Sequence, residues 1–191
     1  MKANAEKLAL RPGLRAARDA FVLGLSPDTR NRLEDGAARH LLPLVMQCRC
    51  VAFYWAVGSE MGCTAAIEQA AAAGIVVALP FVADGGDAMH FRVWQPGAPL
   101  AKGWRGLRQP IYGEAIEPDA FVVPLLGFDS RMRRLGQGGG FYDRALAGRT
   151  EAKKIGFSWA VQQLPAIPCD PWDIVLDMVV TERGAMRKEE A

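Results

Sequence analysis

The sequence contains few of the residues that build metal clusters or disulfide frameworks, and it has no long apolar run. Its 191 residues include four cysteines and two histidines, and no two cysteines form a CxxC pair, so we expect neither a zinc site nor a disulfide framework. No apolar run reaches the roughly 18 residues that a membrane-spanning helix requires. The charged N-terminus also has no uninterrupted apolar stretch of the signal-peptide type. We therefore expect a reduced, cytoplasmic protein that does not enter a membrane.

The sequence also lacks a strong excess of one charge. Lysine and arginine number 23 against 21 aspartates and glutamates, which gives a net charge of +2, too little to indicate nucleic-acid binding. Hydrophobic residues make up 50% of the chain, which is ample for a packed core. The length fits one ordinary domain. We expect a single domain over residues 1–191, acting as a monomer.

The first forty residues have the composition of helices. The stretch that ends near residue 25 is rich in Ala, Leu and Arg, but Pro12 and Gly13 interrupt it, so we expect its helix to begin there. The next stretch opens with Ser26 as a helix cap and Pro27 in the first turn, which together predict a helix start.

The rest of the chain alternates short β-rich runs with helical segments. Residues 49–57 and 75–82 are predicted strands, and Thr64 is expected to cap a helix between them that ends at Gly74, so these residues form a βαβ unit. Further predictions are strands at 89–94, 119–128, 153–159 and 172–181, a loop at 95–118, a helix at about 141–148 and a frayed end at 185–191. The pattern predicts an α/β fold: a mostly parallel open sheet with helices on both faces, in a Rossmann-like three-layer architecture.

The segment "RLGQGGGFYDR", from Arg134 to Arg144, carries the clearest chemical signal. Glycine permits positive φ and a close approach of the backbone to a ligand, and N–H groups at a helix start bind anions. Arginine holds phosphate bidentately, and the Asp143 carboxylate suits a magnesium ion that bridges phosphates. These features together suit a nucleoside triphosphate.

The glycine spacing alone does not identify this site. There is no GxxxxGK[ST] motif, and Gly136, Gly138 and Gly139 do not complete GxGxxG because the last position is Phe141. The alternative is a glycine-rich surface turn between two solvated arginines, followed by an acid that the helix dipole favours.

The longer string "VPLLGFDSRMRRLGQGGGFYDRAL" resembles the signature of the 5-formyltetrahydrofolate cyclo-ligases, also called 5,10-methenyltetrahydrofolate synthetases. That signature resembles P-G-x-x-F-D followed, after a short polar stretch, by R-L-G-x-G-x-G-[YF]-Y-D. The matching residues are Pro124, Phe128, Asp129, Arg134, Leu135, Gly136, Gly138, Gly140, Phe141, Tyr142 and Asp143. The resemblance extends to the basic N-terminal helix, to "FYWAVGSE" and to "WDIVLDMVVTE". It implies that ATP and Mg²⁺ are used to convert 5-formyltetrahydrofolate to 5,10-methenyltetrahydrofolate, through an iminophosphate and with release of ADP and phosphate.

The resemblance also implies a phosphate site. Its residues would be Arg134, Leu135, Gly136, Gln137, Gly138, Gly139, Gly140, Phe141 and Tyr142, with Arg134 and Asp143 as catalytic residues. Arg11 and Arg15, one helical turn apart, would reach the phosphates from the N-terminal helix. Family members often have Lys at the first of these two positions. A solvated helix face is the alternative for this pair, because Pro12 lies between them.

Folate and metal contacts complete what the resemblance implies. Glu60 would accept hydrogen bonds from the pterin ring, with Tyr54 and Trp55 beside it, although an acid at a helix N-terminus is the alternative. Gln137 and Phe141 match positions that touch folate, and Phe141 lacks the hydroxyl of the Tyr found in many members. Asp143 and Asp173 resemble the magnesium ligands, and Asp177 competes with Asp173 for that assignment.

Two other classes of function stay open. A related α/β enzyme that handles sugar phosphates would also use arginines and glycine loops, although it would not need Glu60 after an aromatic strand. A binding module for folate or nucleotide that lacks turnover would keep the same signature, because fold analogy alone does not establish activity.

Overall fold

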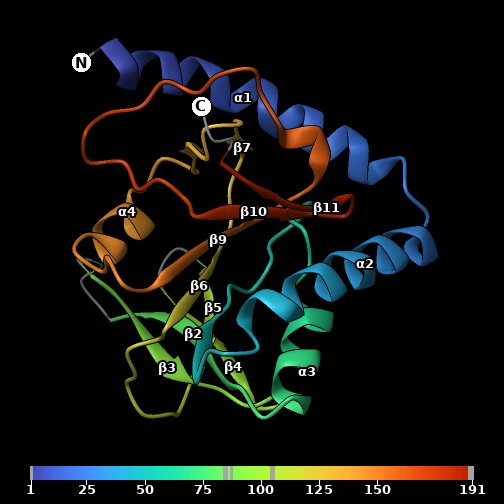
Figure 1. Cartoon of the computed structure of the whole chain (residues 1–191), viewed down its shortest axis with the longest axis vertical. Coiled ribbons are helices and arrows are strands. Elements are labelled where there is room, and N and C mark those ends of the chain that lie inside the picture. Colours follow the sequence, from blue (N-terminus) through green and yellow to red (C-terminus); the bar gives the residue numbers. More distant parts are fainter. Residues whose placement is uncertain (1, 84–85, 87, 104–105, 189–191) are drawn as a thin grey trace.

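The computed structural model describes residues 2–83, 86, 88–103 and 106–188, and a seven-stranded sheet lies at its centre (Figure 1). Its strands are β1 (Cys50–Ala52), β2 (Val76–Val82), β3 (Met89–Val93), β6 (Ala120–Val123), β9 (Lys153–Phe157), β10 (Met178–Thr181) and β11 (Gly184–Arg187). Their spatial order is β11-β10-β9-β6-β1-β2-β3. The five central strands are parallel, and the two edge strands pair antiparallel. The predicted mostly parallel sheet is therefore confirmed.

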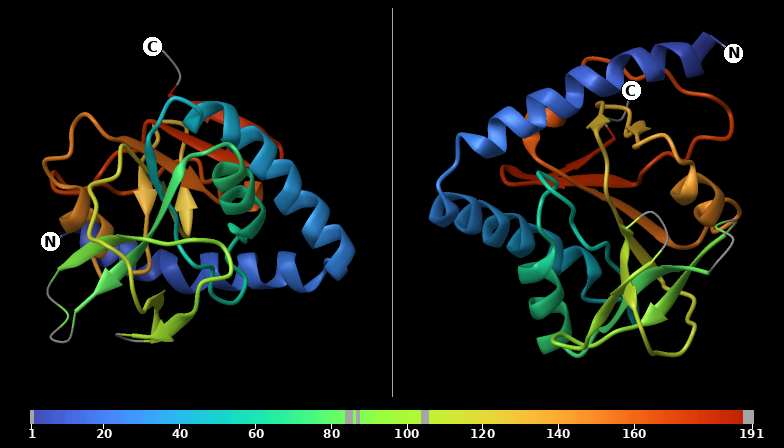
Figure 2. Two further views of the ribbon diagram at one scale, coloured as in Figure 1. Left: turned by 90° about the horizontal axis from the view of Figure 1, so that it is seen from below. Right: turned by 180° about the vertical axis from the view of Figure 1, so that it is seen from behind.

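Helices cover both faces of the sheet, as predicted. They are α1 (Lys2–Leu23), α2 (Pro27–Val45), α3 (Thr64–Ala72) and α4 (Phe141–Leu146), with a short 3₁₀ helix, η2 (Ala160–Gln162). Helices α2 and α3 pack in one apolar cluster, and α4 packs in a second cluster on the other face. Figure 1 and the right view of Figure 2 show α1 across one end of the molecule, with α2 and α4 on opposite sides below it. None of the helices in the described part of the chain is long and apolar enough to cross a membrane.

The strand β6 shows why the sheet is buried on both faces. Its four residues are all buried, and they alternate between the two clusters: Ala120 and Val122 face α2 and α3, whereas Phe121 and Val123 face α4. Successive strand side chains point to opposite faces, so a continuous apolar run fits a strand that is covered twice. The apolar continuity of residues 119–128 predicted this position correctly, but Pro124 ends the strand before the short β7 (Gly127–Phe128).

The N-terminal helix differs from its prediction. We expected it to begin near Pro12, but α1 runs from Lys2 to Leu23 with Pro12 inside it. Proline removes one backbone hydrogen bond and crowds the preceding turn. Side chains on both sides of the proline, from Lys7 to Arg18, are held by the rest of the protein, and these tertiary contacts offset the local cost.

Other helix boundaries follow the sequence more closely. The Ser26 hydroxyl accepts a hydrogen bond from the backbone N–H of Thr29, as expected for an N-cap, and α2 begins at Pro27. Thr64, expected to cap α3, is instead its first residue, and Cys63 takes the cap position without a side-chain hydrogen bond. Gly74 has φ +81° and ends this helix as predicted, because glycine tolerates the left-handed conformation.

Three predicted segments are corrected. The expected loop at 95–118 contains a hairpin of β4 (Leu100–Lys102) and β5 (Arg108–Pro110). Within the predicted strand at 172–181, only the last four residues form β10. The expected frayed end is wrong for residues 185–187, which pair with β10 as part of β11, while residues 189–191 lie outside the described part of the chain. The edge strand forms because β10 exposes an open row of backbone hydrogen-bonding groups.

Candidate active site

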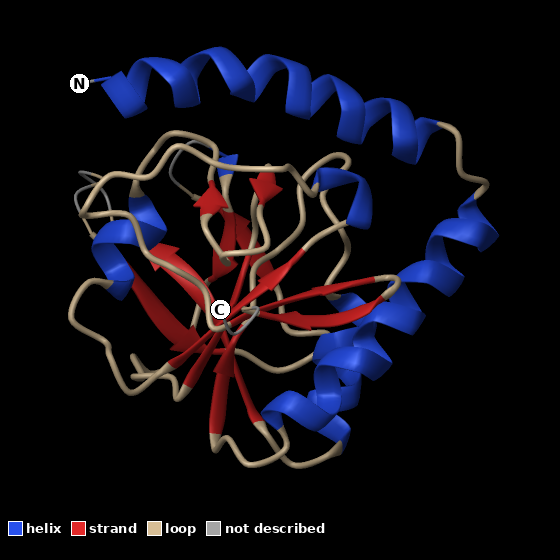
Figure 3. Ribbon diagram, turned by 45° about the horizontal axis from the view of Figure 1, so that its top comes forward, coloured by secondary structure: helices blue, strands red, loops and turns tan. Residues whose placement is uncertain are grey.

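The candidate site lies where two neighbouring strands send their connections to opposite faces of the sheet. The strand β1 leads through residues 53–63 to α3, and β6 leads through residues 124–140 to α4. Because β1 and β6 are parallel neighbours, both loops leave the sheet at the carboxyl ends of its parallel strands. Ligands of open α/β sheets bind in the crevice outside the carboxyl ends of such strands. Figure 3 shows α1 above this end of the molecule.

The glycine-rich segment forms a turn between β8 (Arg134–Leu135) and α4. Gly138 has φ +105° and Gly140 has φ +64°, which are values that favour glycine. A Cβ added to Gly138 would lie 3.3 Å from the guanidinium carbon of Arg11, whose Nε donates to the carbonyl of Gly136 at 3.0 Å. The expected positive φ is present, and the group that lies against the turn in this structure is the side chain of Arg11 from α1.

Arg134 and Asp143 form an ion pair in which one guanidinium nitrogen contacts both carboxylate oxygens. The Nη2 of Arg134 lies 3.0 Å from each carboxylate oxygen of Asp143, and its Nη1 donates to the carbonyl of Pro124 at 3.2 Å. Arg134 is 8% exposed, and its Nε has no hydrogen-bond partner among the described residues. The sequence predicted separate duties for this pair, with Arg134 on phosphate and Asp143 on metal. The structure brings the two groups together as partners.

The remaining residues of the segment divide between turn and core. Gly136 and Gly139 lie in the turn, and a Cβ on Gly139 would come 3.0 Å from the ring of Phe141. Phe141 and Tyr142 are partly buried against the α4-side cluster, and burial raises the pKa of the Tyr142 hydroxyl. Leu135 is 1% exposed within a small apolar cluster under α1. Its side chain therefore belongs to the core, so any contact of Leu135 with a ligand would be made by its backbone.

A second charged cluster contains Lys7, Asp170 and Asp173. Lys7 is 5% exposed, and its ammonium group donates to Asp170 at 2.8 Å and also to Asp173. The backbone N–H of Asp170 donates to Asp173 as well. Burial acts to lower the pKa of Lys7, but the hydrogen bonds to the two aspartates outweigh it, and the pKa is raised. Asp173, predicted as a metal ligand, thus lies in an ion pair with the N-terminal helix.

The structure separates the two candidates for the second metal ligand. The residue after Asp173, Ile174, donates its backbone N–H to Asp143 at 3.3 Å, so Asp173 lies beside Asp143. Asp177 is exposed and accepts a hydrogen bond from the backbone N–H of Lys154 at the start of β9. It therefore lies at the amino ends of the parallel strands, away from the candidate site. Asp143 and Asp173, each now balanced by a basic side chain, supply oxygen donors of the kind that Mg²⁺ binds together with phosphate oxygens and water. Asp143 and Asp173 would be the residues that hold it.

A third cluster surrounds Glu60, in the loop after β1. The Oε2 of Glu60 accepts from the backbone N–H of Val57 at 3.0 Å, and Oε1 accepts from Nε2 of Gln137 at 3.2 Å. The Oε1 of Gln137 in turn accepts from Nη2 of Arg15 at 2.7 Å. Nη1 of Arg18 lies 3.8 Å from the Oε1 of Glu60. Gln137 therefore links the glycine segment to Glu60, and the two side chains are close enough to contact one ligand.

Tyr54 is a core residue, which corrects its assignment to the pterin slot. It is 3% exposed, and its hydroxyl donates to the carbonyl of Met61 at 2.6 Å. Burial raises the pKa of this hydroxyl well above its ordinary range. Tyr54 thus holds the loop that carries Glu60.

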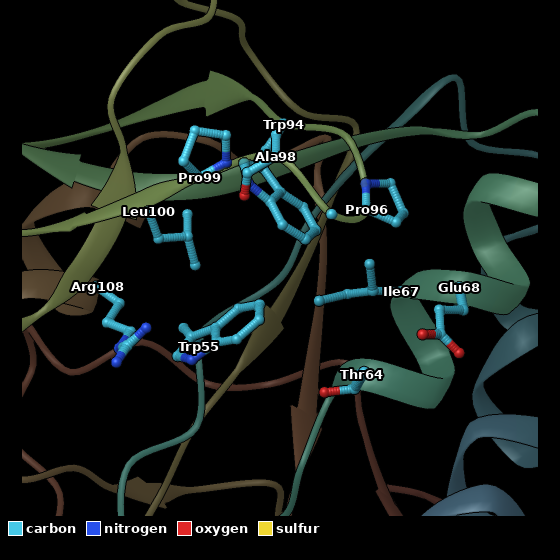
Figure 4. Close-up of a pocket in the computed structure, with 11 residues that line it drawn as sticks. Trp55, Thr64, Ile67, Glu68, Trp94, Pro96, Ala98, Pro99, Leu100 and Arg108 are labelled. Carbon is cyan, nitrogen blue, oxygen red and sulfur yellow. The ribbon is translucent and has the colours of Figure 1, made fainter.

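Trp55, its neighbour, lines a pocket of about 310 Å³ between α3, residues 94–100 and Arg108 (Figure 4). Figure 4 shows Ile67 of α3 on one side of this pocket and Leu100 on the other. Trp55 and Trp94 meet edge to face, with ring centroids 5.7 Å apart, and Arg108 supplies a cation at the rim. Thr64 and Glu68 of α3 also line the pocket, so this mainly apolar pocket carries a charge of each sign and suits a flat, apolar group with polar edges.

One face of α1 joins the three clusters. Positions 7, 11, 15 and 18 lie within about 80° of one another on a helix, and they are Lys7, Arg11, Arg15 and Arg18. Their side chains reach Asp170 and Asp173, Gly136, Gln137 and Ser59 respectively. The predicted pair of Arg11 and Arg15 is thus part of a longer basic stripe, in which Arg11 is partly buried and Arg15 remains exposed to solvent.

Three residues of these clusters, Lys7, Arg18 and Asp170, were not predicted from the sequence. Lys7 and Arg18 were detectable in principle, because they continue the helical spacing of Arg11, but the expected helix start at Pro12 separated Lys7 from the rest. Asp170 follows an irregular loop, and its partner is 163 residues away, so no local pattern indicated it.

Comparison with known proteins bears directly on these observations. The family model described as the 5-formyltetrahydrofolate cyclo-ligase family matches residues 3–182. A 5-formyltetrahydrofolate cyclo-ligase of Escherichia coli K12 is 29% identical over 167 residues, which cover 82% of this chain and 92% of the relative. One from Mycolicibacterium smegmatis is 32% identical over 145 residues, with coverage of 71% and 74%. The solved structure of Aquifex aeolicus 5,10-methenyltetrahydrofolate synthetase superposes with a TM-score of 0.78 at 28% identity, and the match covers 95% of this chain and 94% of that one.

Proposed function

Because this chain belongs to the 5-formyltetrahydrofolate cyclo-ligase family, we propose that it converts 5-formyltetrahydrofolate to 5,10-methenyltetrahydrofolate with consumption of ATP. The family makes it a ligase. The observation that carries the finer proposal is that Glu60, Gln137, Arg134 and Asp143 lie on the loops after β1 and β6, where a sheet of this kind has its ligand crevice, with two basic residues of α1 directed at the same turn. Such a crevice has an acceptor for a pterin at one end and cations for phosphates at the other.

The reaction needs ATP because the formyl amide is a poor electrophile. Transfer of the γ-phosphoryl group to the formyl oxygen gives an iminophosphate, whose carbon is more electrophilic. Nitrogen-10 attacks this carbon and loses its proton, the carbon–oxygen bond breaks, and phosphate leaves. The protein contributes mainly by positioning the reactants and neutralising their charge.

The residues of the crevice supply these contributions. The two glycines with positive φ, Gly138 and Gly140, let backbone N–H groups approach phosphate oxygens. Arg11 and Arg134 supply guanidinium groups beside this turn, and Arg134 would exchange part of its contact with Asp143 for phosphate. Asp143 and Asp173 would hold Mg²⁺, which supplies charge neutralisation on the phosphates when bound.

The direct test is to incubate the purified protein with 5-formyltetrahydrofolate, ATP and MgCl₂ and to follow methenyl formation by absorbance. We expect turnover only when all three are present, with one ADP released per methenyl product. If the protein binds 5-formyltetrahydrofolate but leaves it unchanged, it is a binding module and the proposed activity is wrong.

Glu60→Gln tests the pterin end of the crevice. The amide keeps the shape of the side chain but replaces an anionic acceptor, and a hydrogen bond to a charged group is worth roughly 1.5–3 kcal/mol. We expect the KM for 5-formyltetrahydrofolate to rise about ten- to a hundredfold, with the KM for ATP changed much less. Glu117→Gln is the matched control, because Glu117 is exposed and pairs with Arg149 outside the crevice. Equal losses for both substrates would remove Glu60 from the pterin site.

A further inference from the structure

Arg18 has an unused hydrogen-bond donor within the Glu60 cluster. The side chain is 5% exposed, and its Nε donates to the hydroxyl of Ser59 at 2.8 Å. That hydroxyl donates onward to Asp19. The Nη1 of Arg18 is buried and has no hydrogen-bond partner within the described part of the chain. A buried, unsatisfied charged donor is costly, so a ligand is the natural partner for it.

Arg18 and Glu60 form an ion pair that no hydrogen bond closes. Nη1 lies 3.8 Å from the Oε1 of Glu60, beyond hydrogen-bonding distance. Glu60 is already held by the backbone of Val57 and by Gln137, and Arg18 is held through its Nε by Ser59. Both side chains are thus fixed independently, with a free donor beside a carboxylate.

We infer that Arg18 determines specificity for the pterin ring by donating a hydrogen bond from Nη1 to the 4-oxo oxygen. The inference rests on the proposed function, which supplies the substrate class. Along one edge, a pterin presents the 4-oxo acceptor, the N3–H donor and the 2-amino donors. A carboxylate complements the two donors, and a guanidinium N–H next to that carboxylate complements the oxygen. Glu60, on the loop after β1, and Arg18, on α1, together present this complementary pattern. The hydrogen bond from Arg18 to Ser59 joins the helix to that loop.

Gln137 occupies part of the same space. Its Nε2 donates to the Oε1 of Glu60, as the ring N3–H would. A carboxylate oxygen has two lone pairs, so the ring and Gln137 can share Glu60, with Gln137 closing the edge of the slot.

The test measures two dissociation constants by calorimetry, for 5-formyltetrahydrofolate and for its 4-thioxo analogue. The analogue keeps the N3–H and 2-amino donors for Glu60 and replaces only the oxygen by sulfur, a weak acceptor. The wild-type protein should prefer the 4-oxo ligand by about ten- to a hundredfold, the range for a hydrogen bond to a charged group. In Arg18→Met this preference should fall to about threefold or less, because the 4-oxo ligand loses affinity and the analogue does not.

Matched variants separate this role from general damage. Arg149→Met removes an arginine that pairs with Glu117, and it should keep the wild-type preference. Ser59→Ala removes the hydroxyl that holds Arg18, and it should reduce the preference for the 4-oxo ligand by a smaller factor than Arg18→Met does. If Arg18→Met does not fold, this reduction in Ser59→Ala is the test of the inference. An unchanged preference in folded Arg18→Met, or equal losses for both ligands, would overturn the inference. Failure of the wild-type protein to bind 5-formyltetrahydrofolate would instead refute the proposed function itself.

Discussion

Substituting Lys7 by methionine tests whether the basic stripe of α1 holds the helix in place. Methionine keeps the length and apolar stem of the side chain but removes the ammonium group. Asp170 and Asp173 then remain close together with no cation between them, and their side chains are only 11% and 15% exposed. Removing one partner of a buried ion pair costs roughly 3–5 kcal/mol. At this chain length each kcal/mol lowers Tm by about 2–4 °C, so we expect a decrease of roughly 6–20 °C.

The assay is urea denaturation followed by circular dichroism, together with a thermal melt. Arg49→Met is the control, because the side chain of Arg49 is 93% exposed and lies 3.7 Å from Asp119. A surface pair of this kind is worth about 0–1 kcal/mol. Adding Asp170→Asn to Lys7→Met should recover about 1–3 kcal/mol, because it removes one of the two repelling carboxylates. If Lys7→Met costs no more than Arg49→Met, the reasoning about α1 is refuted.

The pH dependence provides an independent check of the same ion pairs. The pKa of Lys7 is raised above its ordinary value of 10.5 by the two aspartates, against the opposing effect of burial. A raised pKa means that the folded state binds the proton more tightly than the unfolded state does. The contribution of Lys7 is therefore fully present below pH 10.5 and is lost as the pH rises through the pKa in the folded state. The wild-type protein should lose stability in this range, and Lys7→Met should lack that component of the loss.

Two further predictions concern the glycine segment and the metal. Gly138→Ala should weaken ATP binding and lower the free energy of unfolding by about 1–2 kcal/mol, because an L-residue at φ +105° is strained and its Cβ meets Arg11. The control is Gly13→Ala in α1, where nothing lies within 4 Å of the new Cβ, and it should raise the free energy of unfolding by about 0.5–1 kcal/mol. Equal effects of the two substitutions in chemical denaturation would contradict this prediction. Asp143→Asn should cut turnover and raise the Mg²⁺ concentration needed for half-maximal rate, because a carboxylate ligand is lost. An unchanged Mg²⁺ requirement, measured below the variant's own melting temperature, would place the metal elsewhere.

Local signals in the sequence predicted the parts of the fold that depend on local chemistry. Ser26 and Pro27 marked the start of α2 because capping is a property of a few consecutive residues. The glycine segment was placed correctly between a strand and a helix because only glycine fits its positive φ values. The βαβ unit of β1, α3 and β2 followed from periodicity and is confirmed by their parallel register.

The remaining features depend on contacts between distant segments. The continuation of α1 through Pro12 needs side-chain anchors on loops more than a hundred residues away. Asp173 lies next in sequence to Ile174, which contacts Asp143, whereas Asp177 contacts the start of β9, and no local pattern supplies this difference. Tyr54 and Leu135 match the expected positions in the sequence, but their side chains point into the core, because a motif fixes residue order and not the direction of each side chain.

The docking of α1 has a consequence for the order in which the molecule is made. Lys7 pairs with residues 163 and 166 positions further along the chain, and Arg11 and Arg15 reach residues 125 and 122 positions away. During synthesis α1 is therefore made before any of these partners. The partner of Arg18, Ser59, is translated next, and the carbonyl of Gly136 and the side chain of Gln137 follow much later. Lys7 must wait longest, because both of its aspartates lie at positions 170 and 173. The basic stripe of α1 can thus be completed only after nearly the whole described chain has been translated.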